Sequence, residues 1–177
     1  VVGTPFVKER LTHLCHLAFP GSLDSMVEHV NWVMEANGTT DDGWSWERFE
    51  VLHDEAVEPH GYRFEHTSGA SFVHSGDSGP CERLYDAIER SKFAILEMGF
   101  PDWVPSAHHH KPKDVRAFAQ RCATPLGLTH TYIDDASPFP TVLEAEFPVF
   151  SDHVRHLRDG DHIVWDGKDW NVRRSEQ

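Results

Sequence analysis

Residues 70–100, ASFVHSGDSGPCERLYDAIERSKFAILEMGF, decide the fold, because within them the apolar residues change from one periodicity to another. The first six residues, Ala70–Ser75, have the short alternating pattern of a strand. After Ser78-Gly79-Pro80, apolar residues recur at helical spacing as far as Gly99, whose position before apolar Phe100 is typical of a helix end. The stretch therefore predicts a strand, a short loop and one long central helix.

Upstream of this stretch, a second strand completes a β-hairpin. Tyr62–Thr67 alternates apolar and charged residues, and Ser68-Gly69 separates it from Ala70–Ser75 as a two-residue turn. Pairing outward from that turn places Phe64 opposite Val73, which gives the hairpin one apolar face.

The C-terminal end of the chain predicts another hairpin. Asp166-Gly167 is a typical type I′ turn signal between two apolar segments. Pairing outward from this turn places Ile163 opposite Trp170.

Helices are expected at three further places. Apolar residues recur at helical spacing in Lys8–Ala18, in Ser22–Asn37 and in Val115–Cys122. The first two segments are joined by a short Phe-Pro-Gly connection, so they are expected to pack as an N-terminal helical hairpin. The predicted fold class is a single α+β domain over residues 1–177, with mostly antiparallel strands, a long central helix and a C-terminal β-hairpin.

Charge and cysteine content exclude several classes of function. The chain has 29 Asp and Glu against 16 Lys and Arg, a formal net charge of −13, which disfavours general binding to nucleic acid or to anionic membranes. Its three cysteines are widely spaced and form no disulfide framework. No signal peptide or apolar membrane span is visible. We therefore expect a cytoplasmic protein or a component of an assembled particle.

Long irregular segments with large aromatic residues indicate a surface for protein partners. The aromatic residues in and beside these loops, which we expect to bind partners in an oligomer or multi-subunit complex, are Trp44, Phe100, Trp103 and Phe139. The alternative is that these rings fold back over the core.

Residues 157–172, LRDGDHIVWDGKDWNV, resemble the closing hairpin of small β-barrel joining proteins at the head–tail connection of tailed bacteriophages. The resemblance covers 16 residues. It implies a structural role, and our leading hypothesis is a non-catalytic subunit of a larger assembly, such as a virus particle, without a cofactor.

Histidines support an alternative hypothesis. The chain has 14 of them, and His153 and His156 would share one face if residues 151–156 form a helical turn. Together with Asp161 they could bind Zn²⁺ and leave a position for water, as in a zinc-dependent hydrolase. The same histidine content suggests a third hypothesis, a module whose association depends on pH.

Two short motifs resemble known catalytic signatures. His53-Asp54-Glu55 with Pro80-Cys81 is similar to the signature of zinc-dependent nucleoside deaminases, but Leu84 stands where that signature has its second cysteine. The segment Gly76–Pro80 is similar to the nucleophile loop of chymotrypsin-like serine proteases. A helix start, capped by Asp77 or Ser78, explains that segment better.

Overall fold

The computed structural model describes residues 1–21, 29–133 and 148–174. In chain order its elements are α1 (Pro5–Ala18), β1 (Asn37–Thr39), β2 (Trp44–Glu50), the 3₁₀ turn η1 (Glu55–Val57), β3 (His60–His66), β4 (Ser71–His74), α3 (Glu82–Glu89), β5 (Ala94–Glu97), α4 (Pro112–Arg121), β6 (Leu126–Thr129), β7 (Val154–His156), β8 (Asp161–Trp165) and β9 (Trp170–Arg174). Two compact units result, Val1–Gly38 and Thr39–Gln177. The expectation of a single domain stays a prediction.

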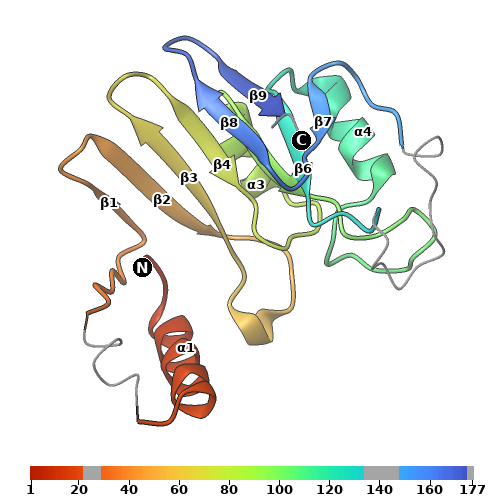
Figure 1. The fold of residues 1–177 in the computed structure, drawn as a ribbon. Helices are drawn as coiled ribbons and strands as arrows, with labels where there is room; N and C mark the ends of the chain where they lie inside the picture. The colour runs from red at the N-terminus through yellow and green to blue at the C-terminus, as the bar shows by residue number, and fades with distance from the viewer. Residues whose placement is uncertain (22–28, 134–147, 175–177) are drawn as a thin grey trace. The chain divides into compact units, whose positions relative to one another are not determined.

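A seven-stranded mixed sheet, ordered β1 to β7, organises the larger unit (Figure 1). Strands β2, β3 and β4 pair antiparallel, whereas β4, β5, β6 and β7 pair parallel. The parallel half arises because α3 connects β4 to β5 and α4 connects β5 to β6, and parallel neighbours need such crossover connections. The expectation of mostly antiparallel strands was therefore wrong.

The long central helix expected after Pro80 is also wrong. Helix α3 ends at Glu89, the chain turns at Ser91 and Lys92, and the apolar run from Phe93 forms the buried strand β5. A strand buried on both faces of a parallel sheet is a continuous apolar run, and such a run is not distinguishable from a buried helix by periodicity. No proline or glycine marks the break.

The hydrophobic core lies between α3, α4 and one face of the sheet. On that face β4 contributes Val73, β5 contributes Leu96 and β6 contributes Leu128, and all three side chains are fully buried. The helix α4 was predicted correctly, and its Phe118 ring stacks on Tyr85 of α3 at 4.2 Å between centroids. This packing holds the crossover helices against the parallel strands and thereby sets the positions of the loops at their ends.

The opposite face of the sheet carries a row of aromatic side chains. Trp46, Phe64 and Phe72 are aligned across β2, β3 and β4, and the rings of Phe64 and Phe72 stack at 4.8 Å. Trp170 of β9 contacts Phe72 edge-on and donates from its indole nitrogen to the Ser71 carbonyl at 2.9 Å. The β8–β9 hairpin is thus attached to this face.

The N-terminal helical hairpin is not present in the described residues. Helix α1 forms as expected and begins with Thr4, whose hydroxyl accepts a hydrogen bond from the Val7 N–H. Residues 29–36 contain no helix, because Val33 instead bridges Val2 and accepts from the Gly3 N–H at 3.0 Å. Residues 22–28 of the expected second helix lie outside the described residues.

Both hairpins exist, but their registers differ from the expected ones. Phe64 pairs with Phe72 rather than Val73, because the turn is a three-residue loop in which Gly69 has φ +84°. Ile163 pairs with Val172 rather than Trp170, because residues 166–169 form a four-residue loop. In each case a longer turn replaces the two-residue turn that the glycine suggested.

The hydrogen bonds of Asp166 predict that the stability of the β8–β9 hairpin depends on pH. Its carboxylate accepts from the backbone N–H of Asp169 and of Lys168, and these bonds, with one from Asn171, hold its pKa below the usual value. Because the folded pKa is the lower one, the stabilisation is present above the unfolded pKa and is lost as the pH falls through the folded pKa. We expect the protection of the β8–β9 amides, measured relative to intrinsic exchange at each pH, to fall as the pH is lowered below about 4. In Asp166→Ala exchange should be fast throughout; an equal acid response in that variant would contradict the assignment.

Candidate functional site

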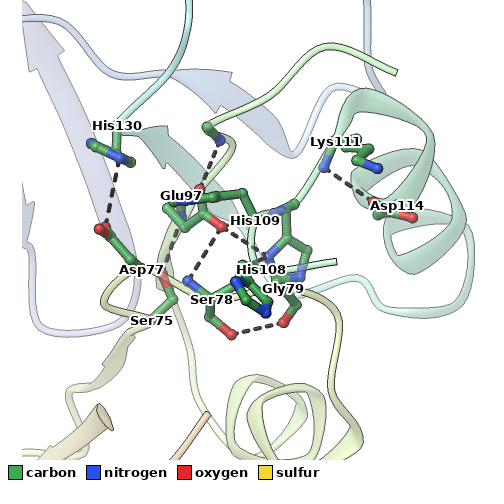
Figure 2. A network of polar contacts seen from close by, with 12 residues as sticks. Ser75, Asp77, Ser78, Gly79, Glu97, His108, His109, Lys111, Asp114 and His130 are labelled. Atoms are coloured by element: carbon green, nitrogen blue, oxygen red, sulfur yellow. Dashed lines mark hydrogen bonds and ion pairs between the residues drawn. The ribbon is translucent and has the colours of Figure 1, made fainter. Parts of the chain in front are cut away.

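Three loops at one edge of the sheet bring polar side chains together. Asp77 follows β4, Glu97 is the last residue of β5, and His130 follows β6. Since β4, β5 and β6 are parallel neighbours, their carboxyl ends lie at the same edge, which is where open α/β sheets place their ligand sites. Figure 2 shows the resulting network.

Asp77 and His130 face each other across the end of β5. The Asp77 Oδ1 and His130 Nε2 atoms are 3.8 Å apart, and about half of each side chain is exposed, so both are accessible from solvent (Figure 2). His130 adopts a left-handed backbone conformation with φ 47°, which is costly for a residue other than glycine. Such strain gathers at functional sites.

Glu97 is a buried carboxylate that ties the loops to one another. Its side chain is 1% exposed. One oxygen accepts from the backbone N–H of Ser78 at 3.3 Å and of His110 at 2.7 Å; the other accepts from the Gly99 N–H at 2.7 Å and lies 3.2 Å from His109 Nδ1. The carboxylate therefore holds the Asp77 loop, its own loop and the His109 loop in one arrangement.

Histidine rings extend the site away from His130. The His109 ring lies 5.7 Å from the His130 ring and 5.0 Å from the His53 ring, measured between centroids, and His53 is 5.6 Å from His108. The neighbouring residue Leu52 accepts from the Gly79 N–H at 2.7 Å, which anchors the His53 segment beside the Asp77 loop. One carboxylate and four imidazoles are thus gathered at this end of the strands: Asp77, His53, His108, His109 and His130.

The Asp77–His130 pair fits part of a zinc site. Carboxylate oxygen and imidazole nitrogen are zinc ligands, and two such ligands bound at roughly 2.1 Å in tetrahedral geometry lie about 3.4 Å apart, close to the separation of this pair. Within residues 1–21, 29–133 and 148–174, no three His, Cys, Asp or Glu are arranged to hold a metal. The described residues therefore show a pair with the spacing of two zinc ligands and no third ligand beside it.

The three residues predicted from the sequence as zinc ligands lie elsewhere. His153 lies in a turn over residues 151–154, and His156 is the last residue of strand β7, so the two histidines do not share the face of a helical turn. The Asp161 carboxylate accepts from the Arg158 N–H at 2.9 Å and lies 3.4 Å from Arg174. Burial lowers the pKa of His156. Metal binding by this set stays a prediction.

The aromatic residues expected to bind partners are dispersed. Trp44 begins β2 and is half-buried against His66 and Phe72, and Phe100 contacts the His109 ring at 4.6 Å. Trp103 is 65% exposed in the turn before α4, and Phe139 lies outside the described residues. A partner role for these four residues stays a prediction.

Sequence reasoning noticed parts of the site for other reasons. The cap expected from Asp77 or Ser78 is wrong, because α3 has Cys81 as its N-cap and no side-chain cap bond. His53 belongs to the deaminase-like motif, and His109 is the middle one of three consecutive histidines. The sequence analysis lacked the parallel strand order. Only that order brings residues 53, 77, 109 and 130, which are far apart in the chain, to the same end of the sheet.

The fold places the chain among structures of metallo-β-lactamase type. It is similar to the metallo-beta-lactamase fold protein YhfI from Bacillus subtilis, with 16% identity, a TM-score of 0.50 and coverage of 63% of this chain and 49% of that one. It is also similar to a diphosphatase from the PhnP family, with 15% identity, a TM-score of 0.57 and coverage of 89% and 54%. A third similar structure is isothiocyanate hydrolase from Delia radicum gut bacteria, with 14% identity, a TM-score of 0.52 and coverage of 71% of this chain and 53% of that one. The chain thus spans about half the length of these structures.

By sequence, 77 residues are 36% identical to the uncharacterized protein ML1173 of Mycobacterium leprae (strain TN), which is 42% of this chain and 27% of that protein. No family model matches the sequence.

These comparisons correct two predictions. The α+β fold with a helical hairpin and a long central helix is replaced by a mixed sheet of metallo-β-lactamase type. The leading hypothesis of a structural, viral assembly subunit is wrong, because the similar structures are hydrolases and proteins of the metallo-β-lactamase fold. Among the described helices, none has the length and apolar character to cross a membrane.

Proposed function

We propose that this protein acts in metal-dependent hydrolysis, with Asp77 and His130 among the metal ligands. One observation carries the proposal: a carboxylate and an imidazole lie 3.8 Å apart at the carboxyl ends of the parallel strands. The similarity to a diphosphatase and to an isothiocyanate hydrolase supports hydrolysis as the reaction class. The same reaction class was the sequence-based alternative, now placed at a different edge of the sheet.

A zinc ion bound there would supply an activated water at neutral pH and would polarise the bond to be cleaved. Asp77 and His130 are half-exposed, so a substrate reaches them without a change in the fold. His130 holds its nitrogen toward Asp77 through the strained backbone turn at the end of β6.

His109 is the residue best placed to move a proton. Its Nδ1 lies 3.2 Å from the buried Glu97 carboxylate, which fixes the orientation of the ring and leaves Nε2 as the nitrogen that would transfer a proton. An imidazole oriented by a buried carboxylate is a recurrent general acid–base arrangement. His109 would thus donate to the leaving group while Glu97 stabilises the imidazolium.

Zinc titration of the purified protein tests the ligand assignment. Competition with a chromophoric chelator should show zinc binding that weakens by more than about tenfold in Asp77→Ala and in His130→Ala, because each variant removes one donor. His162→Ala is the matched control, since this exposed histidine of β8 lies outside the site and should leave the affinity unchanged.

The same titration compares the two candidate sets. If His153→Ala and His156→Ala abolish zinc binding while the Asp77 and His130 variants bind normally, the sequence-based set is right and this proposal is wrong. A wild-type protein that binds no zinc would also contradict the proposal.

A further inference from the structure

His110 is a fully buried titratable group that the proposed chemistry does not use. It follows His109 in the chain, but its side chain is 0% exposed. Its Nδ1 lies 2.5 Å from the carbonyl oxygen of Ser78, in the Asp77 loop, and its Nε2 lies 3.2 Å from the hydroxyl of Tyr85 in α3. The ring therefore joins two segments that are separate in the chain.

The partners of the two ring nitrogens define the tautomer. The Ser78 carbonyl can only accept, so Nδ1 must carry the proton that it donates. Burial, and then the nearby Asp114 carboxylate, raise the pKa of Tyr85, so its hydroxyl keeps its proton and is able to donate to Nε2. Nδ1 is 3.6 Å from the nearest Glu97 oxygen, which is too long for a hydrogen bond.

The backbone of the same residue makes the third connection. The His110 N–H donates to Glu97 at 2.7 Å, and Glu97 in turn accepts from the Ser78 N–H. His110 and Glu97 thus bind the two peptide groups that flank Ser78, His110 at the Ser78 carbonyl and Glu97 at the Ser78 N–H (Figure 2 shows the Glu97 contact). Asp77 is the residue immediately before this doubly held position.

We infer that His110 is a positioning residue, an imidazole with a proton on Nδ1 that holds the Asp77 loop against the His109 loop and so sets where the metal ligand stands relative to the proton donor. The inference rests on the proposed function for its consequence, since His110 itself touches neither substrate nor metal. Without the ring, the Ser78 carbonyl loses its partner, and of these hydrogen-bonded connections only the Glu97 carboxylate still joins the two loops.

Three variants separate the contacts of the ring. Tyr85→Phe removes only the bond to Nε2. His110→Asn removes the same bond but keeps an amide nitrogen near the position of Nδ1, from which it donates to Ser78. His110→Ala removes both bonds. Residues that orient a metal ligand from outside the ligand set commonly change metal affinity by about 10- to 100-fold. We expect a loss of that size in His110→Ala and values within about threefold of wild type in the other two variants.

Nitrogen NMR of the imidazole provides a readout that needs no metal. Wild-type His110 should show a protonated Nδ1 and an unprotonated Nε2, and the amide signals of Asp77 and Ser78 should shift in His110→Ala and return in His110→Asn. An Nε2–H tautomer, or a His110→Asn variant that matches His110→Ala in zinc affinity and amide shifts, would overturn the inference. A wild-type protein with the expected tautomer and shifts but no zinc binding would contradict the proposed function and leave the loop-locking role of His110 supported.

Discussion

Replacing Glu97 by alanine should lower the free energy of unfolding by about 3 kcal/mol, because three backbone donors, two of them buried and one half-buried, then lose their acceptor at once. The N–H groups of Ser78, Gly99 and His110 all point at this carboxylate, and water has no access to a side chain that is 1% exposed. Each stranded donor costs about 1–3 kcal/mol, and part of that cost is recovered as the loops relax. Urea unfolding followed by tryptophan fluorescence measures the loss.

Two further variants show whether the loss of stability comes from the buried acceptor oxygens of Glu97 or from the loss of a negative charge. Glu97→Gln keeps the volume and one acceptor oxygen, but its amide NH₂ faces donors, so the loss should be smaller than in the alanine variant and still clear. Glu50→Ala removes a glutamate that is 78% exposed and lies 3.6 Å from Arg83, and should change stability by less than about 1 kcal/mol. If Glu97→Ala unfolds at the same urea concentration as Glu50→Ala, the carboxylate does not hold the loops.

Local patterns in the sequence predicted the elements that local physics determines. Helices α1 and α4 both carry apolar residues at helical spacing, so both were found. The segment Phe93–Glu97 was misassigned because Ile88 and Ile95 also match a helical face, and only the pairing of Ala94 with Val73 and Leu126 makes it a strand. That pairing joins residues more than 20 positions apart, which no local pattern encodes.

The candidate site depends even more on long-range order. Asp77 and His130 are 53 positions apart, and neither lies in a recognisable metal-binding spacing. They meet because β4 and β6 run parallel on either side of β5. The sequence-based set around His153 was chosen for its short spacing, and that choice required a helical turn through His156, which instead ends strand β7.

Gly79 is where the Asp77 loop and the His109 loop approach most closely, and Gly79→Ala should lower the free energy of unfolding by about 3 kcal/mol. A Cβ at this position would lie 1.7 Å from the carbonyl oxygen and 2.8 Å from the carbonyl carbon of Ala107, and both atoms belong to the backbone. Rotation of a side chain cannot relieve that overlap, so one loop must move away from the other.

The movement of the loop should change the geometry of the candidate site as well as lower the free energy of unfolding. Residue 107 leads directly into the histidine run, so moving it shifts His109 away from Glu97 and from His130. We therefore expect Gly79→Ala to weaken zinc binding along with stability, as measured by urea unfolding and chelator competition on the same preparation. Gly3→Ala is the matched control, because a Cβ there meets Val7 at an ordinary 3.5 Å and should leave both quantities unchanged. A Gly79→Ala variant with wild-type stability would mean that the two loops are not in contact, and the arrangement of the Asp77, Glu97 and His109 groups would then have to be rebuilt.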